Sequence, residues 1–91
     1  MSKLLSAEQV ESELKKLDVA WSAVGDSTLS RVYEFDDFKS ALEFVNKVGA
    51  KAEKLNHHPE IELSWGKVVV NTTTHSEGGL TKKDFELAAS I

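Results

Sequence analysis

The sequence predicts an α+β fold, a four-stranded antiparallel sheet with three helices packed on one face, in the order α-β-β-α-β-β-α. Residues 29–35 and 60–65 alternate apolar and polar side chains, as half-buried strands do. Residues 38–55 repeat apolar side chains at spacings of three and four, which is typical of a helix. Gly25 and Gly66 mark turns between neighbouring strands, and this favours hairpins.

The first third of the sequence is expected to hold one helix and two strands. The helix covers residues 6–18, because Ser6 and Gln9 have the spacing of a capping box and apolar residues follow at helical intervals. Residues 19–24 and 29–35 are expected to form the first two strands. The Gly-Asp turn that separates them favours an antiparallel pair.

The second half repeats this arrangement with a longer helix. The helix over 38–55 must end before Pro59, since the residue that precedes a proline is pushed out of the α region. A third strand is expected over 60–65. The segment 67–74 is rich in β-branched residues and is expected to be the last strand of the sheet.

A short final helix is expected to begin at Thr81, which has capping-box spacing to Asp84, and to bury Phe85. These elements predict one domain over residues 1–91. One face of the sheet then has no helix to cover it. Because a chain of this size buries a modest share of its surface, we expect a second subunit to cover that face.

The composition argues against several classes of function. The chain carries 11 Lys and Arg against 15 Asp and Glu, a net charge of −4, so it lacks the basic surface that binds nucleic acid or anionic membranes. No apolar run approaches the ~20 residues that span a bilayer, and the start lacks a signal-peptide core. There is no cysteine for a disulfide or a thiolate metal site. We therefore expect a cytoplasmic protein.

All three histidines, His57, His58 and His75, lie in the second half of the chain. In a hairpin, the start of one strand lies beside the end of the next. The hairpin expected over 60–74 therefore brings all three histidines to one edge of the sheet. Imidazoles titrate near neutral pH, so such a cluster favours acid–base chemistry, although a single histidine is more often a surface or capping residue.

A metal site is the first alternative, since three histidines can hold a catalytic zinc ion. However, adjacent histidines such as His57 and His58 often point apart, and the spacings that align ligands on one helical face are absent. The sequence also lacks a phosphate-binding glycine loop, a cysteine nucleophile and a serine nucleophile elbow. We therefore expect neither a metal nor a cofactor.

Three motifs together resemble the pterin-4a-carbinolamine dehydratase family. They are Asn-His-His-Pro at 56–59, Thr-Thr-His at 73–75 and Gly-Gly-Leu-Thr-Lys-Lys-Asp at 78–84. The resemblance extends upstream through Tyr-Glu-Phe-Asp-Asp-Phe at 33–38. It implies a hydro-lyase that removes water from 4a-hydroxy-tetrahydrobiopterin to give quinonoid dihydropterin, and so recycles the cofactor of aromatic amino-acid hydroxylases.

The same resemblance implies roles for individual residues. His57 and His75 would be the acid–base residues, and His58 would bind and orient the pterin. The residues that would line the same site are Asn56, Thr73, Thr74 and Ser76. Glu53 and Asp84 would hold an imidazole by hydrogen bonding, although each also has an ordinary explanation, on a polar helix face and in a capping box.

The resemblance further implies a homodimer or homotetramer with a functional link to an aromatic amino-acid hydroxylase. An alternative function is a protein-interaction module without catalysis, a dimerisation cofactor for a transcription factor, as in some relatives. Two positions depart from the family pattern. Ile61 stands where an aromatic residue is common, and Trp65 stands where others carry tyrosine, so pterin stacking by either residue is in question.

Overall fold

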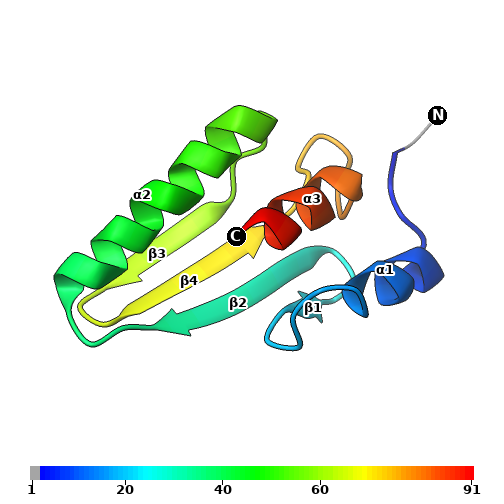
Figure 1. Ribbon diagram of the computed structural model, residues 1–91. Coiled ribbons are helices and arrows are strands. Elements are labelled where there is room, and N and C mark those ends of the chain that lie inside the picture. Colours follow the sequence, from blue (N-terminus) through cyan, green and yellow to red (C-terminus); the bar gives the residue numbers. More distant parts are fainter. Residues whose placement is uncertain (1–2) are drawn as a thin grey trace.

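The computed structural model describes residues 3–91 and has the predicted order α-β-β-α-β-β-α (Figure 1). The elements are α1 (Ala7–Leu14), β1 (Ser22–Val24), β2 (Thr28–Glu34), α2 (Phe38–Leu55), β3 (Glu60–Ser64), β4 (Lys67–Thr72) and α3 (Lys82–Ser90). The strands form one sheet in the order β1-β2-β4-β3, and every pair is antiparallel. The predicted fold class is therefore confirmed.

The β3–β4 hairpin fixes which residues meet at the edge where the histidines lie. Its register runs from Ser64 opposite Lys67, beside the turn, to Glu60 opposite Asn71 at the open end. β4 also pairs with β2, so it is a central strand, whereas β3 lies at the edge. The start of β3 and the end of β4 are therefore neighbours, as the hairpin prediction required.

The core lies on one face of the sheet, under all three helices. Alternate residues of β4, Val68 and Val70, are completely buried there, as is Leu29 of β2. The helices contribute apolar residues to the same cluster: Val10 from α1, Ala41 from α2, and Phe85 and Ala88 from α3. At roughly 25 cal/mol per Å² of buried apolar surface, this cluster is the main favourable term in folding.

Two boundaries at the start of the chain differ from the sequence prediction. α1 ends at Leu14 rather than near residue 18, because the backbone tightens into three-residue turns there, such as Leu17 N–H to Leu14 C=O at 3.1 Å. β1 begins at Ser22 rather than 19. Asp18 accepts a hydrogen bond from the Ala20 N–H at 2.9 Å, and this local turn replaces the first ladder bonds.

The end of β4 also differs. The strand ends at Thr72 rather than 74, and Thr74 instead makes an isolated bridge with Gly79. The Thr74 N–H donates to the Gly79 carbonyl at 2.9 Å, so residues 74–79 form a closed loop. This loop carries His75 and connects the sheet to α3.

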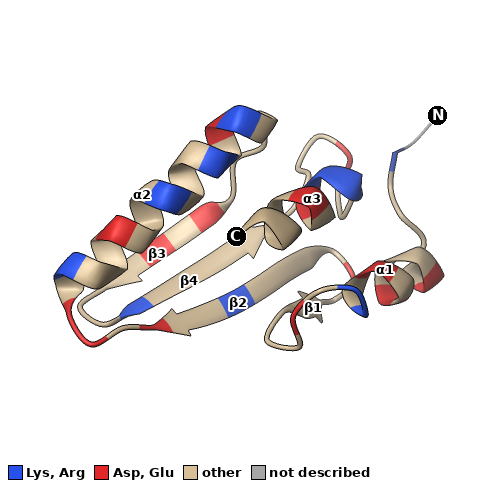
Figure 2. Ribbon diagram, in the orientation of Figure 1, with Lys and Arg blue, Asp and Glu red and all other residues tan. Residues whose placement is uncertain are grey.

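Within residues 3–91, no helix covers the opposite face of the sheet. Val24 and Val32 are 57% and 52% exposed there, and Trp65 in the β3–β4 turn is 68% exposed. Figure 2 shows charge along the helices and β3, while β2 and β4 carry few charged residues. Among the helices of residues 3–91, none combines the length and hydropathy needed to cross a bilayer.

Asp37 caps the start of α2, and its charge should contribute to stability in a pH-dependent way. The Ser40 N–H donates to Asp37 Oδ1 at 2.7 Å, and this hydrogen bond lowers the pKa of Asp37 below its usual value. A lowered carboxyl pKa adds stability above the unfolded-state value of about 3.9, and that stability is lost as the pH falls through the folded-state value.

We therefore expect Asp37→Asn to lower the melting temperature at pH 7, with a difference from wild type that narrows as the pH falls below about 4. Thermal unfolding followed by circular dichroism across pH 2–7 measures this difference. Asp36→Asn is the matched control, because Asp36 lies one residue outside the cap. A difference that persists unchanged at pH 2 would contradict the assignment.

Candidate active site

The end of α2 determines how the first two histidines are presented. Asn56 caps the helix in the left-handed conformation, with φ 52° and ψ 45°, and asparagine is among the residues that tolerate it best. The His57 N–H then donates back to the Ala52 carbonyl at 3.0 Å. The chain thus reverses direction sharply at residue 57, which places His57 and His58 at the open end of the β3–β4 hairpin.

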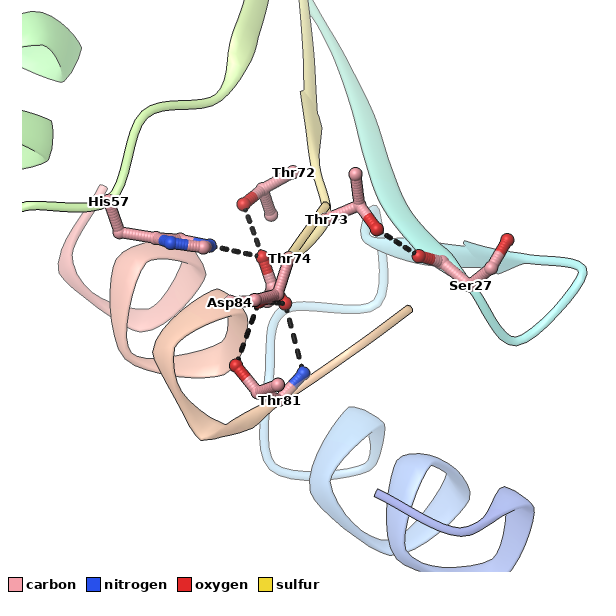
Figure 3. A network of polar contacts seen from close by, with 7 residues as sticks. All are labelled: Ser27, His57, Thr72, Thr73, Thr74, Thr81 and Asp84. Carbon is pink, nitrogen blue, oxygen red and sulfur yellow. Dashed lines mark hydrogen bonds and ion pairs between the residues drawn. The ribbon is translucent and has the colours of Figure 1, made fainter. Parts of the chain in front are cut away.

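His57 points inward, against a buried carboxylate (Figure 3). Its Nε2 lies 2.5 Å from Oδ1 of Asp84, in the first turn of α3. His57 is 8% exposed and Asp84 is fully buried. A contact this short between an imidazole and a buried carboxylate is a charge-assisted hydrogen bond, and it fixes both the ring orientation and which nitrogen faces Asp84.

Three threonines complete the surroundings of Asp84. Thr72 Oγ1 donates to Oδ1 at 2.7 Å, and Thr74 Oγ1 donates to Oδ2 at 2.8 Å. The backbone N–H of Thr81 also donates to Oδ2, at 3.0 Å. With His57, the carboxylate therefore has four donors from residues 3–91, two on each oxygen. A buried carboxylate needs such partners, because an unpaired one would cost several kcal/mol.

His58 and His75 meet on the other side of the chain. They line a pocket of about 140 Å³. Its other lining residues are Thr28, Glu60, Asn71 and Thr73. His58 Nε2 makes a short contact with the carboxylate of Glu53, one turn back in α2, and both side chains are largely exposed. His75 is exposed and makes no side-chain hydrogen bond to the rest of residues 3–91, so its ring is available to a ligand.

Side chains alternate along the extended segment 72–74, and this alternation separates His57 from the other two histidines. Thr72 and Thr74 point toward Asp84, whereas Thr73 points away and donates to the Ser27 carbonyl at 2.5 Å (Figure 3). The predicted site residues thus form two groups on either side of one segment. One group is His58, Thr73, His75 and nearby Glu53. The other is His57, Thr74 and Asp84.

Two of the predicted site residues join neither group. Asn56 serves as the cap of α2. Ser76 borders a separate cavity of about 400 Å³, together with Thr74 and Thr81 and with side chains that include Lys3, Lys82 and Lys83. Ile61 packs against the core, and Trp65 lies in the β3–β4 turn, at the opposite end of the hairpin from Asn71. Neither residue lines the histidine pocket.

Sequence reasoning missed several residues that surround these groups. They are Thr28, Glu60 and Asn71 in the histidine pocket, and Thr72 and Thr81 beside Asp84. A signal for two of them was present in the register. Glu60 and Asn71 are the last pair of the hairpin. They must therefore lie near His58, which precedes Glu60, and His75, which follows Asn71. Thr28 lies in β2, so its place in the pocket could be predicted only from the pairing of β2 with β4.

The positions of the acidic and imidazole side chains bear on metal binding. Within the part of the chain that the structure describes, no three His, Cys, Asp or Glu side chains lie close enough together to hold a metal ion. The reason is visible at the two adjacent histidines, since His57 faces Asp84 while His58 faces Glu53 and the pocket.

The arrangement suits proton transfer. Two histidines each have one ring nitrogen held by a carboxylate, and the third has both ring nitrogens available. Fold and site together define a small α+β protein with a histidine–carboxylate site at one edge of an antiparallel sheet.

Comparison with known proteins identifies the family. The family model described as pterin 4 alpha carbinolamine dehydratase matches residues 3–91. A protein of Nostoc sp. (strain PCC 7120), named "Putative pterin-4-alpha-carbinolamine dehydratase", is 47% identical over 91 residues, which are 100% of this chain and 96% of that protein. A protein of Alkaliphilus metalliredigens with the same name is 39% identical over 96% of this chain and 78% of its own.

A solved structure agrees with these relatives. The crystal structure of a transcriptional coactivator/pterin dehydratase from Brucella melitensis has a TM-score of 0.88 and 36% identity, and covers 94% of this chain and 92% of that one. The chain therefore belongs to the pterin-4a-carbinolamine dehydratase family.

Proposed function

We propose that this chain removes water from a 4a-hydroxy-tetrahydropterin, such as 4a-hydroxy-tetrahydrobiopterin, to give quinonoid dihydropterin. Family membership supports the reaction class. The observation that carries the mechanism is the contact between His57 and the buried Asp84, at 2.5 Å, with two further histidines in a pocket on the other side of the 72–74 segment. Acid–base catalysis of this kind is typically worth about 100- to 10,000-fold in rate.

The reaction needs two proton transfers. The C4a–O bond breaks as the lone pair of a ring nitrogen forms a double bond, an acid protonates the departing hydroxyl to water, and a base removes a proton from ring nitrogen. We assign the acid and base roles to His57 and His75, and the orientation of the pterin to His58. Because Nε2 of His57 is held by Asp84, Nδ1 is the nitrogen that would exchange the proton.

The pocket geometry supports a larger assembly. At about 140 Å³ the histidine pocket is smaller than the roughly 300 Å³ at which ligand pockets begin. The uncovered sheet face beside it carries exposed Val24 and Val32. We propose that the protein is a homodimer or homotetramer, and that an aromatic amino-acid hydroxylase supplies its substrate. All the substrate contacts implied for the site residues stay predictions, and four of those residues do not line this pocket: Asn56, His57, Thr74 and Ser76.

Stopped-flow absorbance tests the proposal. A freshly generated 4a-hydroxy-tetrahydropterin is mixed with the protein, and its decay is compared with decay in buffer and in free imidazole at three times the protein concentration, which matches the number of histidines. We expect decay with the protein to exceed both by at least about 100-fold. Decay no faster than in free imidazole, from folded protein, would refute the proposal.

Glu53 should have a small effect on substrate binding. Its carboxylate contacts His58 on an exposed surface, where an ion pair is worth about 0–1 kcal/mol. We expect Glu53→Gln to raise KM by no more than about fivefold and to leave kcat nearly unchanged, because His58 orients the pterin without transferring a proton. Glu43→Gln, on the same helix, is the matched control. A large fall in kcat would instead assign His58 to proton transfer.

A further inference from the structure

Thr72 occupies a position where an apolar residue would be expected. Val68, Val70 and Thr72 alternate along the same face of β4, and all three are completely buried. Thr72 lies opposite Leu29 of β2, which is also completely buried. Valine has nearly the same shape as threonine, so packing alone does not require a hydroxyl here. A buried hydroxyl has to find a partner, and the partner it has is Asp84.

Thr72 and His57 share one oxygen of that carboxylate. Thr72 Oγ1 lies 2.7 Å and His57 Nε2 lies 2.5 Å from Oδ1 of Asp84. An ionised carboxylate only accepts hydrogen bonds, so both groups must donate to it. The oxygen of Asp84 that accepts from His57 is therefore also held in place by the Thr72 hydroxyl.

The second oxygen of Asp84 is held independently. The Thr81 N–H and the Thr74 hydroxyl both donate to Oδ2, at 3.0 and 2.8 Å. Because Thr74 has one hydroxyl proton, which goes to Asp84, it accepts the proton of Thr81 Oγ1 at 2.8 Å. The α3 side of the carboxylate is thus anchored twice. On the Oδ1 side, Thr72 is the one hydroxyl among the described residues that acts together with the imidazole.

We propose that Thr72 is a positioning residue for His57. Its hydroxyl orients Asp84 so that His57 keeps a proton on Nε2 and leaves Nδ1 open to exchange a proton. Thr72 touches no substrate and acts only through Asp84. The kinetic consequence of this role rests on the proposed dehydratase function, whereas the effect on the His57 ring does not.

Two substitutions separate the hydroxyl from the packing. Thr72→Val keeps the branched shape and removes the hydroxyl, and Thr72→Ser keeps the hydroxyl and removes the methyl group. The first measurement is the ¹⁵N and ¹H NMR spectrum of the His57 ring in the protein without substrate, assigned with single histidine variants. We expect Thr72→Val to move the two His57 ring nitrogen signals away from the wild-type tautomer pattern, and Thr72→Ser to keep that pattern.

The second measurement is kcat, KM and their pH dependence by stopped flow. We expect Thr72→Val to lower kcat on the order of tenfold, the scale of one hydrogen bond to a charged group, and to shift a limb of the pH–rate profile. KM should change little, and Thr72→Ser should retain wild-type kcat even if its melting temperature falls.

Each outcome decides the proposal. A Thr72→Val protein with the wild-type His57 spectrum overturns it, and so does a Thr72→Ser protein that alters the spectrum as much as Thr72→Val, since packing would then be the cause. If the wild-type protein shows no dehydratase activity, the proposed function fails, but the ring spectra still decide whether Thr72 positions His57.

Discussion

Replacement of Asp84 by asparagine is expected to lower kcat/KM by about 100- to 10,000-fold, because it inverts the hydrogen bonding around His57. The Thr81 N–H is a fixed backbone donor at 3.0 Å from Oδ2, so the amide oxygen must take that position. The amide NH₂ then faces His57 and Thr72, where two acceptors would be needed. His57 can answer only by moving its proton from Nε2 to Nδ1, the nitrogen assigned to the reaction.

The substitution should also lower the stability of the fold, by less than it lowers activity. Four donors surround Asp84, and the amide satisfies fewer of them. We expect a loss of about 1–3 kcal/mol in the free energy of unfolding, measured by urea denaturation. Glu86→Gln is the matched control, since Glu86 is an exposed carboxylate two residues along α3 and contacts neither histidine group. An Asp84→Asn protein with wild-type kcat/KM would show that His57 needs no particular tautomer.

Asp84 also illustrates what sequence reasoning leaves open. Its spacing to Thr81 predicted a capping box, and its place in the family motif implied a contact with an imidazole. The structure shows that one carboxylate does both, with Oδ2 at the helix start and Oδ1 on His57. The two roles are compatible because a carboxylate has two oxygens, each able to accept two donors.

The fold followed from the sequence where periodicity was strong. The long stripe of α2 and the alternation in β2 and β3 predicted those elements nearly to the residue. The prediction failed at the end of α1 and the start of β1, where Asp18 forms a local turn that competes with regular structure. Secondary-structure propensity describes each residue by itself, so it does not take hydrogen bonds between side chains and backbone into account.

The site was predicted in outline for a topological reason. A hairpin forces its open ends together, so the shared pocket of His58 and His75 followed from the pairing of β3 with β4. The sequence did not specify that His57 would face the opposite way. That direction depends on the left-handed cap at Asn56 and on the packing of α3 against α2, and the packing is set by tertiary structure.

Among the exposed residues, His75 should be the one whose replacement lowers the reaction rate most. Its side chain makes no hydrogen bond to the rest of residues 3–91 and lies on the 74–79 loop, so removing the imidazole should leave folding intact. We expect His75→Ala to lower kcat by about 100- to 10,000-fold, the range of general acid–base catalysis, with little change in melting temperature. Stopped-flow decay of the 4a-hydroxy-tetrahydropterin measures the rate, and circular dichroism measures stability.

Chemical rescue separates a catalytic His75 from a merely structural one. The side chain of His75 is exposed and its pocket opens to solvent, so free imidazole can reach the vacated position in His75→Ala. We expect added imidazole to restore part of kcat in this variant, in proportion to the concentration of the imidazole form that carries the missing proton or lone pair. The pH dependence of the rescue then tells which of the two roles His75 has. Rescue that follows imidazolium assigns the acid that protonates the leaving hydroxyl, and rescue that follows neutral imidazole assigns the base. If imidazole leaves the variant as slow as before while wild type stays fast, His75 acts by shaping the pocket, and proton transfer must fall to His57 and His58.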